Sequence, residues 1–493
     1  MRLSDLAGAG VVSEAMDDAE ATASGEATAN GEVTGFALDH RQVARGNVFG
    51  AFAGARFNGE DFIGDAVARG AIAVVARPEV QVEGVRHIAS DHPRKTFAEI
   101  AAKFYAPYPD TIVAVTGTNG KTSTVEMTRQ LWRMAGHRAA SIGTLGVTTA
   151  DDQVTTGLTS PDIITFLANM AGMRKMGISH VAYEASSHGL DQYRAEGVPV
   201  KAAAFTNFSR DHLDYHADMD SYFAAKMRLF DEVVAADGTA VLWADDPRSG
   251  NVIARARARG LKLITVGEAG ETIQLAGRSS TPLGQTLMLR HAGQEHRLSL
   301  PLIGAYQAAN VLVAAGLVLA TGGDWATTLL GMGRVAPVRG RLERAVIGRN
   351  GAPVYVDYAH TPDAVDAAIA ALRPHVANDA GGRLITVIGA GGDRDEGKRA
   401  AMGEVAARLS DVVIVTDDNP RSEDPAKIRR AMLLGAPHAT EIGDRRAAIG
   451  AALAMARSGD IVLIAGKGHE QGQIVGEMVL PFDDVTVARE CAA

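Results

Sequence analysis

Residues 111–122 read TIVAVTGTNGKT, and this stretch decides what kind of fold the chain can adopt. The apolar and β-branched run Thr111–Val115 indicates a buried strand. A glycine-containing loop follows at Gly117–Gly120, and a helical pattern continues from Ser123. Strand, glycine loop and helix in this order form a phosphate-binding loop, because backbone N–H groups and the helix N-terminus can face phosphate oxygens.

The residue types in the loop predict how ATP is held. Lys121 would reach the terminal phosphates, and the Thr122 hydroxyl would bind Mg²⁺. The first glycine of the usual G-x-x-x-x-G-K-[ST] pattern would fall at Val115, so this loop is a shorter G-x-x-G-K-T variant. The predicted phosphate contacts are Gly117, Thr118, Asn119, Gly120, Lys121, Thr122 and Ser123.

Composition narrows the class of protein. The 493 residues suggest three domains, and the apolar and charged fractions are those of globular protein. A net charge of −9 argues against a nucleic-acid partner. The single cysteine, Cys491, fits a reducing compartment, and the long apolar stretch 308–320 is too short to span a bilayer. We expect a cytoplasmic, monomeric enzyme without a membrane partner.

Short apolar strands alternate with helical patterns from residue 111 onward. This rhythm predicts α/β domains built on mostly parallel sheets. Boundaries near residues 108 and 337 divide the chain into domains at 1–108, 109–336 and 337–493. Residues 272–300 instead predict an antiparallel patch, and the biased segment 19–35 predicts an exposed loop or a loose hairpin.

The third domain places polar or glycine-rich residues after each of four predicted strands. These strands are 353–356, 384–388, 412–416 and 461–465. Ligands bind outside the carboxyl ends of strands in open parallel sheets. The four strand ends therefore predict one binding site.

A metal that serves a phosphate loop needs a carboxylate at the end of a neighbouring strand. Glu184, which follows the predicted strand 178–183, is the best candidate. The run 206–216 holds Asp211, His212 and Asp214, which could bind metal or form a capped loop with satisfied polar groups. Lys226, within an apolar helical pattern, is interpreted from its surroundings alone as a surface lysine.

The chain resembles the Mur ligase family, the ATP-dependent amide-bond synthetases that build the peptidoglycan precursor. The resemblance extends from about Asp39 to Val487. The motifs that carry it, in the family's order, are Gly117–Thr122, Glu184, Asn207 with Asp211-His212, Gly304–Asn310, Gly340–Glu343 and Asp357–Asp363.

This resemblance implies three domains: an N-terminal UDP-binding α/β domain, a central P-loop ATPase and a C-terminal Rossmann-like domain. Gly391–Asp395, Asp418–Arg421 and Gly466–Glu470 resemble the members that add the third residue of the stem peptide. The sequence DNPR at 418–421 resembles the form that selects meso-2,6-diaminopimelate over lysine. The implied activity joins this amino acid to UDP-N-acetylmuramoyl-L-alanyl-D-glutamate through an acyl phosphate.

The resemblance also implies the site residues. Lys121, Glu184, His212 and Lys226 would be catalytic, with Lys226 carbamylated by CO₂ so that it joins Thr122, Glu184 and His212 as a Mg²⁺ ligand. ATP would further contact Asn310, Arg341 and His360. The UDP substrate would contact Asp39, His40, Arg41, Thr159, Ser160, Ser186, Gln192 and Arg194.

For diaminopimelate, Arg394 and Arg421 would clamp carboxylates, because guanidinium groups bind them bidentately. Glu470 and Asn419 would hold the distal ammonium group. The complete predicted set is Arg394, Asp418, Asn419, Pro420, Arg421, Gly466 and Glu470. The positions that depart from the family's common pattern are His40, Ala55-Arg56, Ser160, Trp243 and Gln307.

Four other functions are also compatible with a phosphate-binding loop in this sequence. A lysine-adding member of the family and a folylpolyglutamate synthetase would share the acyl-phosphate chemistry. A P-loop kinase would phosphorylate a hydroxyl group and stop there. A nucleotide-gated binding protein would bind ATP without turnover.

Overall fold

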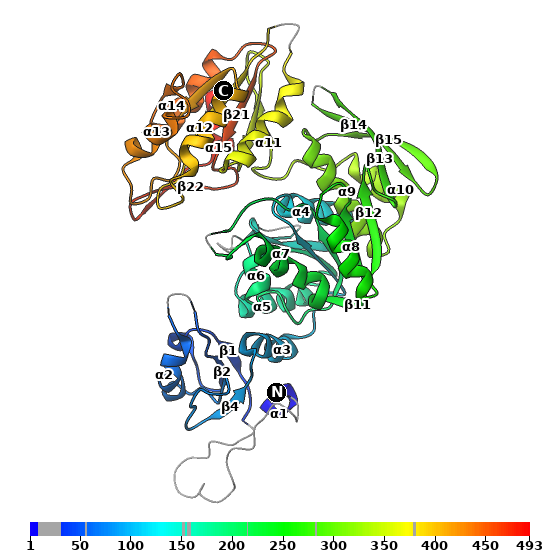
Figure 1. The fold of residues 1–493 in the computed structure, drawn as a ribbon, viewed down its shortest axis with the longest axis vertical. Helices are drawn as coiled ribbons and strands as arrows, with labels where there is room; N and C mark the ends of the chain where they lie inside the picture. Colours follow the sequence, from blue (N-terminus) through cyan, green and yellow to red (C-terminus); the bar gives the residue numbers. More distant parts are fainter. Residues whose placement is uncertain are drawn as a thin grey trace, which may run out of the picture. The chain divides into compact units, whose positions relative to one another are not determined.

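The computed structural model describes residues 1–7, 31–54, 57–149, 153–154, 159–213, 215–281, 283–377 and 381–493 (Figure 1). The predictions for residues 19–30, Ala55-Arg56 and Asp214 lie outside these residues. The described chain divides into two compact units. The first comprises residues 1–121, 136–242 and 246–264, and the second comprises residues 122–135, 243–245 and 265–493. The boundaries proposed near residues 108 and 337 stay predictions.

A small parallel sheet opens the first unit. Its order is β1-β2-β3-β4, and the Val and Ala residues of β3 are fully buried. Helix α3 (Pro93–Tyr105) begins at a proline, which suits the first helical turn, and packs its apolar face on this sheet. The other elements are α1 (Leu3–Ala7), β1 (Gly35–Ala37), β2 (Asn47–Gly50), α2 (Ile63–Ala68), β3 (Ala73–Ala76) and β4 (Arg86–Ala89).

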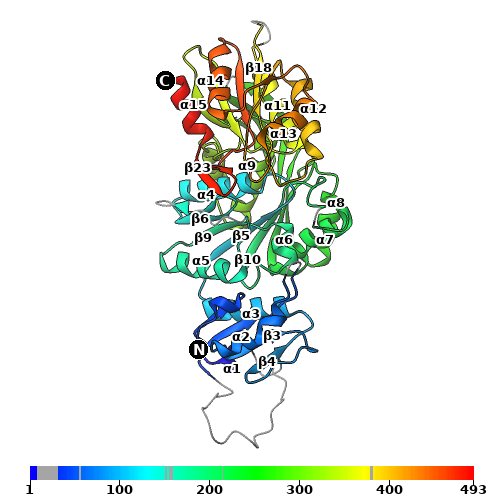
Figure 2. The same cartoon turned by 90° about the vertical axis from the view of Figure 1, so that its left-hand side faces the viewer.

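The phosphate-loop strand, β5 (Thr111–Thr116), lies in the middle of a second sheet of the first unit. The order is β11-β10-β5-β9-β6-β7-β8, and Figure 2 shows β6, β9, β5 and β10 side by side. All six residues of β5 are buried, because parallel strands are covered on both faces. The partners are β6 (Ala139–Gly143), β7 (Gly146–Thr148), β8 (Gln153–Val154), β9 (His180–Glu184), β10 (Val200–Phe205) and β11 (Val234–Trp243).

Register places the strand ends of this sheet together. Val115 of β5 lies opposite Glu184 of β9, and Thr116 lies opposite Phe205 of β10. The loops after β5, β9 and β10 therefore leave from one edge, as the sequence predicted for parallel strands. The other α-helices described in the first unit are α5 (Ile163–Lys175), α6 (Ser187–Asp191), α7 (Met219–Arg228) and α8 (Ser249–Ala258).

The second unit contains the predicted antiparallel patch. Strands β13 (Ile273–Thr281), β14 (Gly284–His291) and β15 (Gln294–Leu300) pair antiparallel, and β13 pairs parallel with the end of β12 (Lys262–Gly267). Helices α4 (Lys121–Met134), α9 (Ala305–Ala320) and α10 (Trp325–Met332) complete this part. The apolar stretch 308–320 forms most of α9 and is largely buried. Among the described helices, none is both long and apolar enough to cross a bilayer.

The last sheet has the order β16-β17-β21-β18-β19-β20 and is parallel except for β16. Alternate residues of β18 enter two cores, Leu384 and Ile388 on one face and Ile385 and Val387 on the other. Figure 2 shows α14 and α15 on one side of β18 and α11, α12 and α13 on the other. The four strands predicted in this region are confirmed.

The elements of this sheet are β16 (Glu343–Ile347), β17 (Pro353–Asp357), α11 (Pro362–Leu372), β18 (Leu384–Ile388), α12 (Lys398–Leu409), β19 (Val412–Val415), α13 (Pro425–Leu433), β20 (Thr440–Glu441), α14 (Arg445–Met455), β21 (Ile461–Ala465) and α15 (Asp484–Ala492). A hairpin of β22 (Gly472–Val475) and β23 (Met478–Pro481) follows β21.

A fully buried ion pair joins α14 and α15 beneath two strand ends. The Arg445 guanidinium donates to both carboxylate oxygens of Asp484 at 2.8 and 2.7 Å, and both side chains are 0 % exposed. Burial alone would lower the pKa of Arg445, but the paired Asp484 carboxylate outweighs it and raises that pKa. Arg445 also donates to two backbone carbonyls. One belongs to Ala465, the last residue of β21, and the other to Asp417, which follows β19.

The substitution Asp484→Ala should destabilise this domain strongly, because it leaves the Arg445 charge buried without a partner. We expect a loss of about 3–5 kcal/mol in the free energy of unfolding, measured by urea denaturation. The control is Glu490→Ala, which removes the exposed pair with Arg446 on the same two helices and should change stability little. Equal losses in the two variants would contradict this account.

Candidate active site

The loop after β5 is held by residues that follow β10. Asn119 N donates to the Asn207 side-chain oxygen at 2.8 Å, and the Asn207 amide donates back to the Asn119 carbonyl at 3.1 Å. Gly117 has a φ of 142°, and a Cβ atom there would lie 2.0 Å from Thr206 Oγ1. The loop therefore needs glycine at 117 and takes its shape from Asn207. The family motif had pointed to Asn207, but its task as a clamp was not predicted.

Two lysines meet at the carbonyl oxygen of Gly117. Lys121 Nζ donates to it at 3.0 Å, and Lys226 Nζ donates to it at 2.7 Å. Lys226 is 1 % exposed and its ammonium nitrogen lies 4.4 Å from the centre of the Tyr222 ring. Burial lowers the pKa of Lys226 well below its usual value, and the charge of Lys121 lowers it further. The interpretation of Lys226 as a surface lysine is therefore wrong.

Glu184 lies at the end of β9 and is 3 % exposed. Its Oε1 atom accepts from Thr144 N at 2.7 Å, and Oε2 accepts from the Thr144 hydroxyl at 3.2 Å. A Cβ atom on Gly143 would lie 2.2 Å from Glu184 Oε1, so the strand end leaves space for this carboxylate. Thr144 was missed in the sequence, because no motif marks it.

Hydrogen bonds connect Glu184 with several predicted substrate residues. The Ser160 hydroxyl donates to the Glu184 carbonyl at 3.1 Å and lies 3.0 Å from the Ser186 hydroxyl. Thr144 Oγ1 lies 3.1 Å from Thr159 Oγ1. Arg194 donates to the Ser160 carbonyl and to the Gln192 side chain. The predicted residues Thr159, Ser160, Ser186, Gln192 and Arg194 thus form one polar network beside Glu184.

The other predicted UDP-binding residues, Asp39, His40 and Arg41, contact one another or Phe62. Arg41 donates to both carboxylate oxygens of Asp39, and this hydrogen bonding lowers the pKa of Asp39 to about 2. His40 stacks on Phe62 with ring centres 4.4 Å apart. Among the described residues, no hydrogen bond joins this trio to the network beside Glu184.

A cluster of aromatic and imidazole rings surrounds His212. The His212 ring lies 4.9 Å from the His188 ring and 5.8 Å from the Tyr222 ring, measured between centres. Its backbone has a φ of 54°, and its N–H donates to the Asp211 carboxylate at 2.9 Å. The Tyr222 hydroxyl lies 3.2 Å from Thr118 Oγ1, so the cluster reaches the phosphate loop.

Magnesium binding was predicted from Thr122, Glu184, His212 and Lys226. Among the described residues, no three His, Cys, Asp or Glu side chains gather as a ready metal site. The donor chemistry nevertheless fits Mg²⁺, because a carboxylate has more lone pairs than the Thr144 contacts use, and hard oxygen ligands suit this ion. The buried Lys226 amine also fits carbamylation, since a carbamate nitrogen keeps one N–H for the Gly117 carbonyl.

The second unit connects the other predicted ATP contacts. Asn310 donates to the Gln307 side chain at 3.4 Å, and Gln307 donates to the Arg341 carbonyl at 3.0 Å. The Arg341 guanidinium lies 4.7 Å from the Tyr358 ring centre and donates to the Thr122 hydroxyl at 3.4 Å.

His360 joins the same group through Tyr358. Its Nδ1 atom lies 2.8 Å from the Tyr358 carbonyl, and the two rings are 4.6 Å apart between centres. Desolvation by the surrounding groups lowers the pKa of His360. The predicted residues Thr122, Asn310, Arg341 and His360 are therefore connected through Gln307 and Tyr358.

The predicted acceptor residues meet at the ends of β18, β19 and β21. Arg421 Nη1 donates to the Gly392 carbonyl at 2.7 Å, and its backbone has a φ of 51°. A Cβ atom on Gly391 would lie 2.8 Å from Arg421 Nη1 and 3.9 Å from Arg394 Cγ, so the two arginines flank one glycine. The buried Pro420 directs its carbonyl at Gly392.

The loops after β19 and β21 also carry two carboxylates, Asp418 and Glu470. A Cβ atom on Gly466 would lie 2.4 Å from Asp418 Oδ2, so glycine lets Asp418 enter the site. Asn419 donates to Glu470 Oε2 at 2.7 Å, and Lys467 Nζ donates to Asn419 Oδ1 at 2.8 Å. Lys467 was not predicted as a site residue.

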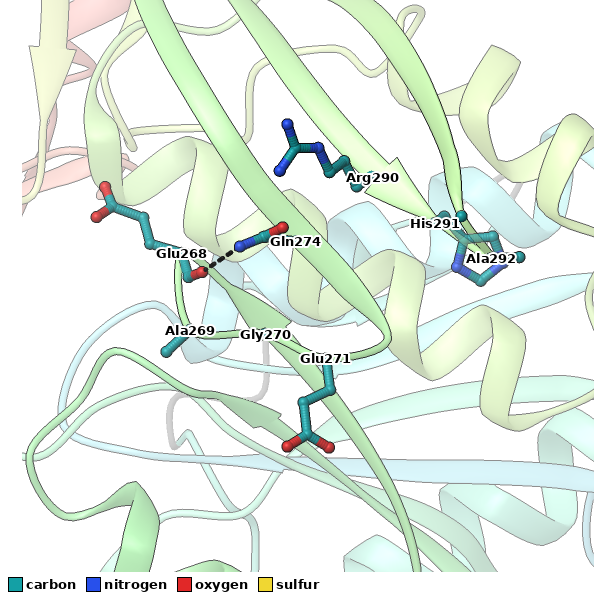
Figure 3. A pocket seen from close by; sticks show the side chains of 9 residues that line it. Glu268, Ala269, Gly270, Glu271, Gln274, Arg290, His291 and Ala292 are labelled. Carbon is teal, nitrogen blue, oxygen red and sulfur yellow. Dashed lines mark hydrogen bonds between the residues drawn. The ribbon is translucent and has the colours of Figure 1, made fainter.

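A pocket of about 470 Å³ lies elsewhere in the second unit (Figure 3). It lies between the turn Glu268–Glu271 and the hairpin end Arg290–Gly293, where Gln274 donates to the Glu268 carbonyl. None of the predicted site residues lines it.

Comparison with known proteins places this geometry in a family. The model of the Mur ligase middle domain matches residues 115–318, and that of the Mur ligase glutamate ligase domain matches residues 340–468. The UDP-N-acetylmuramoyl-L-alanyl-D-glutamate–2,6-diaminopimelate ligase of Zymomonas mobilis is 60% identical over 460 residues, which cover 92% of this chain and 94% of the relative.

Two further matches agree with it. The ligase of the same name from Caulobacter vibrioides is 50% identical over 459 residues and covers 92% of this chain and 93% of its own. A solved structure of a ligase with this name has a TM-score of 0.70 and 32% identity, over 93% of this chain and 94% of that chain.

These matches include the phosphate loop with Glu184 and Lys226 and the loops that carry Asp418–Arg421. The expected α/β fold with mostly parallel sheets is confirmed by the sheet order and by the matched structure. This chain therefore belongs to the Mur ligase family.

Proposed function

We propose that this protein is an ATP-dependent ligase that joins 2,6-diaminopimelate, in its meso form, to UDP-N-acetylmuramoyl-L-alanyl-D-glutamate. The observation that carries the proposal is the acceptor site, where Arg394 and Arg421 flank Gly391, and Asp418 and Glu470 follow β19 and β21, the two strands that pair with β18. The identity of 60% with the Zymomonas mobilis ligase supports the same substrates.

We also propose that the protein is cytoplasmic and acts as a monomer. Its single cysteine suits a reducing compartment.

Both charged ends of diaminopimelate find counterparts in this set of residues. An amino-acid carboxylate accepts two parallel hydrogen bonds from a guanidinium group, which Arg394 or Arg421 supplies. An ammonium group needs oxygen acceptors, which Glu470 and Asp418 supply. Lysine lacks the distal carboxylate and would leave an arginine in the site without its partner, so the site favours diaminopimelate.

The proposed reaction has two steps. The γ-carboxylate oxygen of the D-glutamyl residue attacks the γ-phosphorus of ATP, ADP leaves, and an acyl phosphate forms. The amine of diaminopimelate then attacks the acyl carbon, the carbon–oxygen bond to phosphate breaks, and the amine releases a proton. The products are the amide, ADP and inorganic phosphate.

The first step brings two anions together, so its main requirement is positive charge and N–H groups near the phosphates. Backbone N–H groups of Gly117–Gly120 and the start of α4 would bind the phosphates, and Lys121 would exchange its loop carbonyls for phosphate oxygens. Mg²⁺, held by Thr122, Glu184, His212 and carbamylated Lys226, would neutralise phosphate charge. Arg341 would add a second cation, and Asn310 and His360 would contact the nucleotide.

Two observations support a carbamate on Lys226: its side chain is buried, and it shares the Gly117 carbonyl with Lys121. Two ammonium groups beside one carbonyl repel each other, so the buried one is favoured as a neutral amine. The nitrogen of a neutral amine attacks the carbon of CO₂, one C=O π bond opens and the nitrogen releases a proton to solvent, so the side chain carries a carboxylate in place of a cation. The Asp39–Arg41 loop and the network of Thr159, Ser160, Ser186, Gln192 and Arg194 would bind the UDP substrate.

The acceptor screen tests the proposed function. Phosphate release from ATP should require both the UDP-dipeptide and meso-2,6-diaminopimelate, with kcat/KM about 10⁴-fold lower for L-lysine. Equal turnover with lysine would contradict the choice of acceptor. ADP formation without an amide product would indicate a kinase instead.

The variant Arg421→Ala should raise KM for diaminopimelate by about 10- to 100-fold, because it removes a charged hydrogen-bond donor. Its KM for ATP should not change. The control is Arg430→Ala, an arginine 68% exposed on the nearby helix α13. An unchanged KM for diaminopimelate in Arg421→Ala would argue against the clamp.

The variant Gly143→Ala tests the role of Glu184 without changing its charge. The added methyl group would occupy the space of the Glu184 carboxylate, and we expect kcat to fall by about 10- to 100-fold. Gly172→Ala is the control, because a Cβ atom there meets nothing within 4 Å. If both variants keep full activity, the position of Glu184 does not matter for the reaction.

The variant Lys226→Ala should lose activity and regain part of it when short carboxylic acids are added, since these replace the carbamate oxygens. Wild-type activity should also fall in CO₂-depleted buffer and return with bicarbonate. Lys201→Ala, which alters an exposed lysine of β10, serves as the control. Absence of both effects would count against the carbamate.

A further inference from the structure

We infer that Lys467 is a positioning residue for the acceptor amino acid: its ammonium group fixes Asn419 and Glu470 so that Glu470, and not Asn419, binds the distal ammonium of the ligand. The inference rests on the proposed ligation of 2,6-diaminopimelate. It changes the predicted role of Asn419 from a ligand contact to a bridge.

Lys467 is a cation enclosed by the acceptor loops. It follows β21 and is 0 % exposed. Its Nζ atom donates to Asn419 Oδ1 at 2.8 Å and to Glu470 Oε2 at 3.4 Å. A buried ammonium group is retained only where hydrogen bonds and opposite charge compensate it. Asn419 and Glu470 supply that compensation, so their positions and the position of Lys467 depend on one another.

Hydrogen bonds already occupy the Asn419 side chain. Its Oδ1 atom accepts from Lys467 Nζ and from Ile474 N at 2.9 Å, and a carbonyl oxygen has two lone pairs. Its amide donates to Glu470 Oε2 at 2.7 Å, and the side chain is 3 % exposed. The oxygen therefore has no acceptor position left for an ammonium group of the ligand.

Glu470 remains available to the ligand. Its side chain is 31% exposed, and the hydrogen bonds from Asn419 and Lys467 both reach Oε2. The other oxygen, Oε1, can accept from an ammonium group. Asp418, Glu470 and Lys467 together carry one net negative charge, which the distal ammonium of diaminopimelate would neutralise. Without Lys467, the two carboxylates would repel each other more strongly.

The same contacts connect ammonium recognition with Arg421. Ile474 belongs to the hairpin strand β22, and its carbonyl accepts from Arg421 N at 3.0 Å. The neighbouring Gln473 side chain donates to the Asp418 carbonyl at 2.7 Å. The hairpin thus contacts Asp418, Asn419 and Arg421, and Lys467 shares the Asn419 Oδ1 atom with Ile474 of the hairpin.

The test compares Lys467→Met with wild type in steady-state ligation. We expect KM for diaminopimelate to rise about 10- to 100-fold, as for loss of a charged hydrogen bond, with KM for ATP and kcat within about twofold. Lys427→Met, an exposed lysine of α13, is the matched control and should behave as wild type. A KM for diaminopimelate within twofold of wild type in Lys467→Met would overturn the inference.

A double-mutant cycle separates positioning from direct contact. If Lys467 acts by positioning Asn419 and Glu470, the variant Lys467→Met/Asn419→Ala should be less impaired than the product of the two single effects. Multiplicative effects would show that Lys467 acts independently and would overturn the inference. Wild-type enzyme without activity toward diaminopimelate would instead refute the proposed function, so the two failures are distinguishable.

If Lys467→Met does not fold, a crystal structure of the wild-type protein with its ligand tests the same inference. In a crystal structure with bound meso-2,6-diaminopimelate, the distal ammonium should contact Glu470, and Asn419 Oδ1 should keep its bonds to Lys467 and Ile474. An Asn419 oxygen on the ligand ammonium would overturn the inference.

Discussion

The carbonyl oxygen of Gly117 is the constraint on which the nucleotide side of this protein depends. It accepts hydrogen bonds from Lys121 and from the buried Lys226, and the loop that presents it is fixed by Thr206 and Asn207. Two ammonium groups at one buried oxygen cannot both be favoured, and burial lowers the pKa of Lys226. The geometry that shapes the phosphate loop thus also favours a neutral amine on Lys226, as the proposed carbamate requires.

A comparable constraint orders the acceptor side. The loops that follow β18, β19 and β21 approach one another closely. Gly392 leaves space for the Pro420 carbonyl, and Gly466 leaves space for the Asp418 carboxylate. The buried pair of Arg445 and Asp484 holds backbone carbonyls beneath these loops. Charged groups in the site are therefore supported by other buried charges, which allows the loops to keep polar side chains oriented before a ligand binds.

The sequence could predict much of this because the decisive patterns are local. The run 111–116 and the apolar strands 353–357, 384–388 and 461–465 are short, buried and followed by polar residues, so strand and site positions followed from parallel-sheet geometry. Lys226 could not be predicted as buried from its own helix, because its partner Gly117 lies 109 positions away. Thr144 and Lys467 were missed for the same reason: their roles arise from contacts between distant loops.

In the proposed reaction, phosphoryl transfer activates the γ-carboxylate of the UDP-dipeptide, and diaminopimelate then attacks the activated carbonyl. The most direct measurement uses UDP-N-acetylmuramoyl-L-alanyl-D-glutamate labelled with ¹⁸O in that carboxylate and analyses the released phosphate by mass spectrometry. An acyl-phosphate intermediate predicts one ¹⁸O atom in each phosphate for each amide formed. Phosphate without ¹⁸O would contradict this account, because the carboxylate oxygen would then never have been bonded to phosphorus.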